Sequence, residues 1–373
     1  MNKIYITVFL VTFTIAGFFC GCTKKDNGDK NSGQYIVDMS GRKIWVPENV
    51  GRIVCKGPGT LRLITYLQAT DKVVGIEGGF EKQSVSGRPY RIAHKELTAL
   101  PTIGTAGPSP QADSEAVLQV RPDVVFISYA EGRIVKNLQD RTGIPVVVLD
   151  PGPLGELDSN SVFQSLELAG NILGKKKRAQ KVIEFIKSTE NELKQHVKNL
   201  PKQAKSSVYV GGLGYKGSHG ITSTQVDYPG FELLDVNNIA GELPQQGHIS
   251  VSKEKLLQWN PDVIFIDGGG LELILTDYQK NPKFYKSLKA VENNQVYVLL
   301  PYNFYTTNIG TALANYFYMG KVLYGSAFKD VNPTEKADMI YSFLVGTGVF
   351  EQMQKDYSGF KKLNLLERKH GEN

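Results

Sequence analysis

The segments EAVLQVRPDVVFI at residues 115–127 and EKLLQWNPDVIFI at residues 254–266 carry one pattern twice in the same chain. They share a Glu, a Leu-Gln pair, Pro-Asp, and the Val, Phe and Ile of an apolar run, all in one register. Each copy predicts a helix that begins near the Glu and ends before the proline, because proline cannot continue a helix. The apolar run that follows is typical of a buried strand. We therefore predict that the chain contains two similar α/β halves.

Short apolar runs elsewhere indicate that each half is built on a mainly parallel sheet. They lie at residues 50–56, 72–76 and 145–149 in the first half and at 208–212 and 296–300 in the second. Between the halves, residues 174–200 have apolar side chains at three- and four-residue steps, at Ala179, Val182, Ile183, Ile186, Leu193 and Val197. This spacing predicts one long helix with an apolar face. The predicted fold class is α/β, with two similar lobes joined by that helix.

The first 34 residues predict export and anchoring. Lys3 precedes an apolar run at residues 4–19, which is short for a membrane span and typical of a signal peptide. The following Phe-Cys-Gly-Cys resembles a bacterial lipobox, in which a small residue precedes the acylated cysteine, so Cys22 is the predicted lipidation residue. We predict a signal peptide at 1–21 and a polar, flexible tether at 22–34. A plain secretory signal or an uncleaved anchor helix is the alternative.

Composition limits the classes of protein that remain. Of the three cysteines, only Cys55 lies beyond the lipobox, so no disulfide framework is expected and Cys55 is predicted to be a core residue. The formal net charge of +6 is too small to indicate nucleic-acid binding. The predicted domains are an N-terminal lobe at 35–173, the linking helix at 174–200 and a C-terminal lobe at 201–373. Neither a cofactor nor an enzymatic activity is expected, since the chain has no GxSxG, HExxH or phosphate-binding loop motif.

A glycine-rich stretch, SVYVGGLGYKGSHGIT at residues 207–222, contains the spacing GxGxxG. A dinucleotide site needs a helix to open at the last glycine, because the pyrophosphate binds the free N–H groups of that helix. β-Branched residues and Pro229 follow Gly217 instead. We therefore predict a flexible loop that leaves a strand, and not a nucleotide site.

In order along the chain, these features resemble the substrate-binding proteins of ABC transporters for iron complexes, siderophores and vitamin B12. The resemblance rests on DMSGRKIWVPENVGRIV at 38–54, KGPGTLRLITYLQATDKVVGI at 56–76, both repeats, the strand and loop at 208–224, and SLKAVENNQVYVL at 287–299. It implies two lobes with a ligand cleft between them, joined by a long helix that restricts closure. It also implies a lipid-anchored, extracytoplasmic binder that acts as a monomer and not as an enzyme.

The resemblance implies a site formed by loops at the carboxyl ends of strands from both lobes. The residues expected to contact the ligand are Gly57, Pro58, Gly59, Arg88, Tyr129, Arg133, Tyr215, His219, His248, Asn303, Phe304 and Tyr305. Tyr302 is also placed among the aromatic residues of the cleft. No metal is expected to be bound directly, and His219 and His248 are candidate contacts to a chelate. Ordinary hydrogen bonding is the alternative role for both histidines.

The expected cargo is a small-molecule metal chelate such as a ferric siderophore or haem. Arg88, Arg91, His94 and Arg133 could pair with its negative charge, or they could be solvated surface residues. Cobalamin, another metal chelate or an oxyanion remain alternatives on the same fold, and a lipid-anchored surface module without a transport role is a further one.

Glu115 and Glu254 begin the two repeats and match family positions that dock against arginines of the membrane permease. Two charges on corresponding faces would fix the orientation of the partner. Each Glu could instead only stabilise the first turn of its helix through the helix dipole. The expected partners are therefore the permease and ATPase subunits of a transporter and the membrane that holds the lipid, with no nucleic acid.

Overall fold

The computed structural model describes residues 32–79, 84–107, 112–153, 155, 159–200 and 206–367. The chain separates into Met1–Ser32 and a compact unit, Gly33–Asn373, to which every element named below belongs. The predicted signal peptide, Cys22 and most of the predicted tether lie outside the described residues. Strand β1 begins at Gly33, so it includes the last two residues of the predicted tether. No helix in the described part of the chain is long and apolar enough to cross a membrane.

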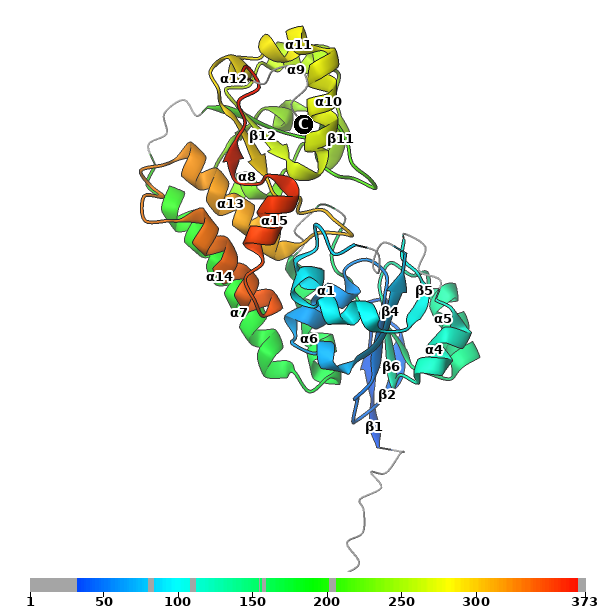
Figure 1. Ribbon diagram of the computed structural model, residues 1–373. Helices are drawn as coiled ribbons and strands as arrows, with labels where there is room; N and C mark the ends of the chain where they lie inside the picture. Colours follow the sequence, from blue (N-terminus) through cyan, green and yellow to red (C-terminus); the bar gives the residue numbers. More distant parts are fainter. Residues whose placement is uncertain are drawn as a thin grey trace, which may run out of the picture. The chain divides into compact units, whose positions relative to one another are not determined.

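The first half is built on a five-stranded parallel sheet with the strand order β5-β4-β3-β6-β7 (Figure 1). The strands are β3 (Ile53–Lys56), β4 (Val73–Gly78), β5 (Thr102–Thr105), β6 (Val124–Ile127) and β7 (Val146–Val148). Side chains alternate between the two faces of the sheet, as they must in a strand. Val125 and Ile127 pack with α4 (Ser114–Val120) and α5 (Gly132–Thr142), whereas Phe126 and the predicted core residue Cys55 join the larger core on the other face.

Four further helices of the first half contribute to the larger core, namely α1 (Thr60–Tyr66), α3 (Pro89–Ala93), η2 (Lys95–Ala99) and α6 (Ser159–Ile172). A short helix, η1 (Thr70–Lys72), leads into β4 and buries no residue. Of the five strands, β5 was not predicted, because its sequence TIGT contributes only Ile103 to the core.

The second half repeats the plan with the order β10-β8-β12-β13-β14, in which only β14 is antiparallel. The strands are β8 (Ser207–Gly211), β10 (Asn237–Asn238), β12 (Val263–Asp267), β13 (Val296–Leu299) and β14 (Lys361–Lys362). The surrounding elements are α8 (Pro229–Leu233), η3 (Ile239–Glu242), α9 (Lys253–Trp259), η4 (Gly268–Gly270), α10 (Leu271–Lys280), α11 (Pro282–Lys286) and α12 (Lys289–Glu292). A separate antiparallel ribbon pairs β9 (Ser223–Gln225) with β11 (His248–Ser250). No helix begins at the last glycine of the GxGxxG stretch, Gly217, as predicted.

The two sequence repeats adopt the same local structure. Helices α4 and α9 both end at a residue in the left-handed conformation, Arg121 (φ 44°) and Asn260 (φ 44°). The aspartate after the proline then bonds to the start of the neighbouring strand. Asp123 accepts the N–H groups of Gly51 and Arg52, both at 2.8 Å, and Asp262 accepts the N–H of Ser207 at 2.8 Å. Each repeat is therefore a helix–turn–strand unit whose turn is fixed by one carboxylate.

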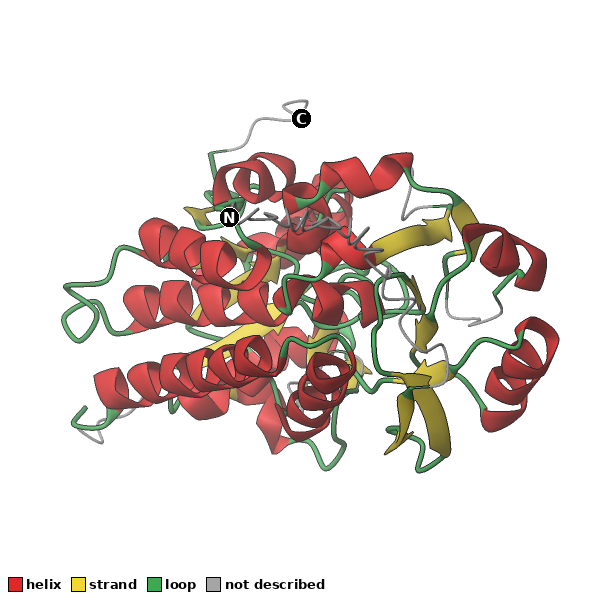
Figure 2. Ribbon diagram, turned by 90° about the horizontal axis from the view of Figure 1, so that it is seen from below, coloured by secondary structure: helices red, strands yellow, loops and turns green. Residues whose placement is uncertain are grey.

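The predicted long helix is α7 (Lys176–Val197), and its predicted apolar face is buried. It contacts α6 of the first half and α8 of the second. It is not alone, because α13 (Ile309–Leu323) lies against it and α14 (Pro333–Val345) lies against α13 (Figures 1 and 2). Helix α14 also contacts α1 and α3, and α15 (Phe350–Tyr357) contacts α14. The two halves are thus held by a layer of long helices.

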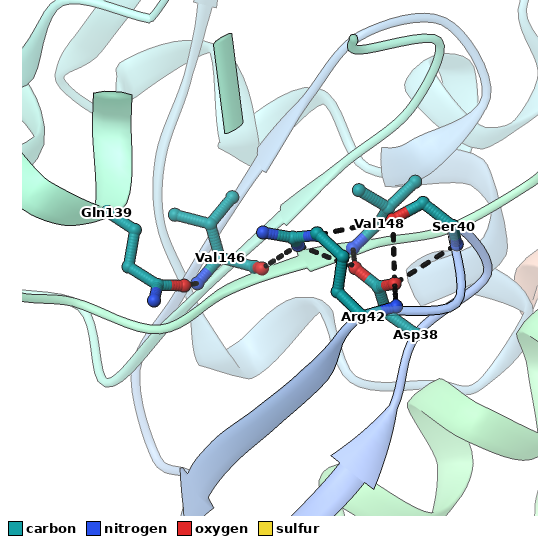
Figure 3. Close-up of polar contacts among 6 residues, drawn as sticks. All are labelled: Asp38, Ser40, Arg42, Gln139, Val146 and Val148. Carbon is teal, nitrogen blue, oxygen red and sulfur yellow. Dashed lines mark hydrogen bonds and ion pairs between the residues drawn. The ribbon is translucent and has the colours of Figure 1, made fainter. Parts of the chain in front are cut away.

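The N-terminal hairpin of β1 (Gly33–Val37) and β2 (Lys43–Pro47) is fastened to the edge strand β7 by its turn (Figure 3). Asp38 accepts hydrogen bonds from Ser40, from Arg42 and from the N–H of Val148. Arg42 also donates to the carbonyl of Val146 at 2.6 Å. Burial alone would raise the pKa of Asp38, but these donors outweigh it and the pKa lies below its usual value.

The two turn carboxylates give a matched prediction. We expect Asp123→Ala and Asp262→Ala each to lower the free energy of unfolding by about 1–3 kcal/mol, because backbone N–H groups at a strand start lose their acceptor. Urea unfolding followed by circular dichroism would measure this. Asp123→Asn and Asp262→Asn keep one carbonyl acceptor and should lose less. Equal losses in the Ala and Asn variants would show that charge, not the hydrogen bonds, holds the turns.

Candidate functional site

Loops at the carboxyl ends of the parallel strands bring the candidate site together. In the first half these loops include Gly57–Gly59 after β3, Tyr129 after β6 and Gly152 after β7. Left-handed backbone is concentrated here, at Gly57 (φ 87°), Gly59 (φ 81°) and Tyr129 (φ 51°). A Cβ on Gly59 would come within 2.7 Å of Thr306, which belongs to the second half. Glycine is therefore required where the two halves approach each other.

Residues 300–308, between β13 and α13, form a loop that contacts both halves, and we call it the bridging loop. Asn308 holds its shape by donating from Nδ2 to the carbonyls of Tyr302, Phe304 and Thr306. Tyr305 and Thr306 are both left-handed, with φ of 55° and 64°. Non-glycine residues tolerate this conformation only when their surroundings fix it. The loop is therefore held in one shape by its own hydrogen bonds.

Several hydrogen bonds join the bridging loop to the first half. The Tyr305 hydroxyl donates to Glu77 Oε2 at 2.8 Å, and Arg62 Nη2 donates to the Tyr305 carbonyl at 2.9 Å. Thr306 Oγ1 lies 3.1 Å from the Tyr129 hydroxyl. Tyr302, which is buried, donates to the carbonyl of Gly155 at 2.9 Å. These bonds fix the loop against the strand ends of the first sheet.

A buried ion pair lies behind Tyr305. Lys56 Nζ is 2.6 Å from Glu77 Oε1 and also donates to the carbonyl of Thr105 at 2.7 Å. Both side chains are buried. Burial raises the pKa of Glu77, and the charge and hydrogen bond of Lys56 oppose that rise. Sequence reasoning missed this pair. A charged residue at or next to the end of each of two buried strands, IVCK and VVGIEG, was a signal that could have revealed it.

Arg62 places a buried positive charge beside the bridging loop. Arg62 is only 2% exposed, and its Nε has no hydrogen-bond partner. Among the described residues, no carboxylate forms an ion pair with it. Its charge acts on Tyr129: burial raises the pKa of that phenol and Arg62 partly offsets the rise. The residue Tyr129 is 43% exposed. A negatively charged ligand near it would balance the charge of Arg62.

The second half contributes an aromatic cluster of Tyr215, His219 and His248. Tyr215 stacks on His248 with ring centroids 4.4 Å apart and planes 4° apart, and the two imidazoles are 5.7 Å apart. Residues predicted from two stretches, the glycine-rich stretch and the segment at His248, are thus brought together. Asn303, on the bridging loop, donates to the carbonyl of Gly214 at 2.7 Å and fixes the loop to this cluster.

Hydrogen bonds determine the tautomer of both histidines. His219 Nε2 lies 2.8 Å from the carbonyl of Tyr215, so this nitrogen carries the proton. His248 Nε2 lies 2.8 Å from Ser223 Oγ, whose own hydrogen is donated to the carbonyl of Leu213. The Ser223 oxygen is therefore the acceptor, and His248 Nε2 is the donor. Both Nδ1 atoms therefore keep their lone pairs. A neutral imidazole with a free lone pair is the form that binds a metal.

The ionisation of His248 agrees with a role in binding a metal through Nδ1. Burial lowers the pKa of His248, and the nearby His219 imidazole lowers it further. A lowered pKa favours the neutral ring, which keeps its lone pair. No group of three or more His, Cys, Asp and Glu residues that could hold a bare metal ion occurs in the described part of the chain. Two imidazoles suit a metal that brings most of its own ligands.

The predicted arginines behave differently from expectation. The prediction that Arg88 and Arg91 could be solvated surface residues is wrong, because both are fully buried. The Arg88 guanidinium lies 5.4 Å from the ring centroid of Phe304, and it bonds to the carbonyl of Ser84. Arg91 donates to Thr98 Oγ1 at 2.9 Å. These contacts support packing roles. Arg133 is exposed in the first turn of α5, outside the network of contacts described above.

The remaining predicted residues lie in three kinds of environment. Pro58 accepts a hydrogen bond from Ser128 Oγ at 2.7 Å, which joins the loops after β3 and β6. Tyr302, placed in the cleft by the resemblance, is 1% exposed and packs edge-on against Tyr228, so it is a core residue. Glu115 and Glu254 are exposed in the first turns of α4 and α9.

Comparison with known proteins identifies the family. Residues 53–302 match the periplasmic binding protein family, so the chain belongs to it. These are substrate-binding proteins of transporters and not enzymes. The molybdate-binding protein MolA of Haemophilus influenzae is 24% identical, with 80% of this chain and 86% of that protein covered. The iron-uptake system-binding protein of Bacillus subtilis is 25% identical, with 80% and 91% covered.

Solved structures support the fold. MolA bound to molybdate superposes with a TM-score of 0.66 at 21% identity, over 85% of this chain and 99% of that one. A periplasmic solute-binding protein from Veillonella parvula gives 0.69 at 19% identity, over 87% and 97%. At such identities the likeness establishes the two-lobed α/β architecture that the repeats predicted.

Asp267, at the end of β12, gives a prediction of pH dependence. Burial raises its pKa from 3.8 to about 7, although the N–H groups of Gly269 and Tyr302 oppose the rise. The folded state thus holds this proton more tightly than the unfolded chain, so stability falls as the pH rises from about 4 to about 7. We expect Asp267→Asn to unfold like the unaltered protein at pH 4 and to be more stable at pH 8, by up to about 4 kcal/mol.

Urea unfolding at both pH values would measure this difference. Asparagine keeps an oxygen that can accept from Gly269, and any effect of its NH2 group on the Tyr302 N–H is present at both pH values, so the pH dependence of the difference reports the charge. An equal change at pH 4 and pH 8 would contradict the assignment of the titration to Asp267.

Tyr305 gives a second prediction. Tyr305→Phe leaves Glu77 Oε2 without its phenol donor, and we expect a loss of about 1–3 kcal/mol in unfolding free energy. Tyr297→Phe is the control, because that hydroxyl bonds only locally to Gln295. Equal effects of the two variants in urea unfolding would show that the Tyr305 bond does not fasten the bridging loop.

Proposed function

We propose that the protein is a lipid-anchored, extracytoplasmic binder that captures an anionic iron chelate and delivers it to an ABC permease. The observation that carries this proposal is the pair of imidazoles, His219 and His248, whose Nδ1 lone pairs are left available by their hydrogen bonds. A ferric chelate whose ligand leaves coordination positions open could take one or both of them. Stacked Tyr215 holds the ring of His248 in place.

The first half supplies charge and an aromatic surface for the same cargo. Arg62 has no carboxylate partner among the described residues, which favours a ligand with negative charge. Tyr129 is partly exposed beside it and offers a ring and a hydroxyl. The iron-uptake relative from Bacillus subtilis supports an iron-containing cargo, whereas a ferric siderophore and haem both fit a site with these groups.

Binding of an oxyanion is the second candidate. MolA of Haemophilus influenzae is named for molybdate binding, and the buried charge of Arg62 would suit any small anion. The two candidates differ in their need for the histidines, because an oxyanion has no open metal position for an imidazole to fill. The same variants therefore distinguish them.

We expect His219→Ala and His248→Ala together to weaken binding of a ferric chelate with two open coordination positions by at least tenfold and to shift its visible absorption band. Binding of a ferric chelate whose ligand fills all six positions should change far less, which makes that complex the matched control. Absorption titration and native mass spectrometry of the purified protein with both complexes, haem, cobalamin and molybdate would measure this.

Three results would contradict the iron-chelate proposal. Tight binding of molybdate with no retention of a ferric complex would favour the oxyanion. Equal loss for both ferric chelates would show that the histidines shape the site without coordinating iron. Retention of cobalamin alone would favour a corrinoid cargo.

A further inference from the structure

The two sequence repeats expose a leucine as well as a glutamate. Leu118 and Leu257 occupy the same position in the two repeats, three residues after Glu115 and Glu254. They are 44% and 37% exposed, which places them among the most exposed large apolar residues of the described chain. Residues three apart on a helix share a face. Each repeat therefore presents one carboxylate and one apolar side chain side by side.

The surroundings leave both glutamates available. Lys253 and Lys255 flank Glu254, but they form ion pairs with Asp277 and Glu242, each at 2.7 Å. Among the described residues, neither Glu115 nor Glu254 has an ion-pair partner. An exposed carboxylate without an ion-pair partner, beside an exposed leucine, is suited to a surface that is both cationic and apolar.

The helices that carry the patches are built alike. A side-chain cap begins each helix, Asp113 in α4 and Ser252 in α9, and each ends in the same left-handed turn. The remaining buried faces of the two helices pack on their own sheets, at Val117 and Leu256. Packing inside the protein explains those residues, but it does not explain why exposed Leu118 and Leu257 are the same residue type in both copies.

We infer that Leu118 and Leu257 are the apolar half of a twin docking surface, each leucine acting with the glutamate of its own helix. The partner is the permease of the proposed function, and this inference rests on that function. Because the two patches are equivalent, the permease must offer two equivalent sites, each with a basic group and an apolar recess. Such sites are what two copies of one subunit would provide.

The two kinds of residue predict different kinetics. Removing a charge mainly slows association and weakens its salt dependence, whereas removing an apolar contact mainly speeds dissociation. We expect Leu118→Ala and Leu257→Ala each to raise the dissociation rate about fivefold, and both together about 25-fold, since distant sites act additively. Glu115→Gln and Glu254→Gln should lower the association rate at low salt.

The experiment is biolayer interferometry of the full-length protein on the permease–ATPase complex in lipid nanodiscs, at two salt concentrations. Leu273→Ala on α10 is the matched control, because Leu273 is 46% exposed and lies outside the repeats. Cargo titration of every variant checks that the fold and the cargo site are intact. Leucine variants that dissociate no faster than Leu273→Ala would overturn the inference and leave the proposed function standing. No binding by the unaltered protein would overturn both, even where cargo binding persists.

Discussion

The Glu77 carboxylate is the point on which the arrangement of the candidate site depends. It is buried, and it accepts from Lys56 of the neighbouring strand, from the Gly57 N–H and from Tyr305 of the second half. A buried carboxylate is tolerated only when its oxygens are paired, so all three donors must be in place together. One side chain thereby fixes the loop after β3 and the bridging loop with respect to each other. Asn308 makes that constraint effective, because it keeps the bridging loop rigid.

The parts of the fold that sequence could predict are those in which local pattern and burial agree. The repeats, the central strands and α7 have strong apolar periodicity. The structure places these elements where that periodicity predicted them. Strands β5, β10 and β14 are short and nearly without core side chains, so their pairing is decided by neighbours distant in sequence. The sequence shows the Pro-Asp pair of each repeat, but it does not show which groups the aspartate contacts. Only the structure shows that Asp123 and Asp262 fasten the turn to an adjacent strand.

The structure brings some of the predicted site residues together and gives others a different environment from the one expected. Tyr215, His219 and His248 are in contact with one another. Burial of an arginine, however, depends on contacts that no local pattern encodes, such as that of Arg88 with Phe304 from the other half. Arg62 was passed over for the same reason, because it lies in an ordinary apolar helix and only the fold buries its charge.

The repeats also connect the two surfaces that transport would require. In each one, a helix carries the exposed glutamate and leucine, and the strand that follows ends near Tyr129 in one half and at Asp267 in the other. The turn between helix and strand is fixed by a carboxylate, so each patch is fastened to its own sheet. A cargo that contacts both halves and changes how they are held would therefore change the spacing of the two patches. A partner with two equivalent sites responds to that spacing, because it can engage both patches only when their separation fits.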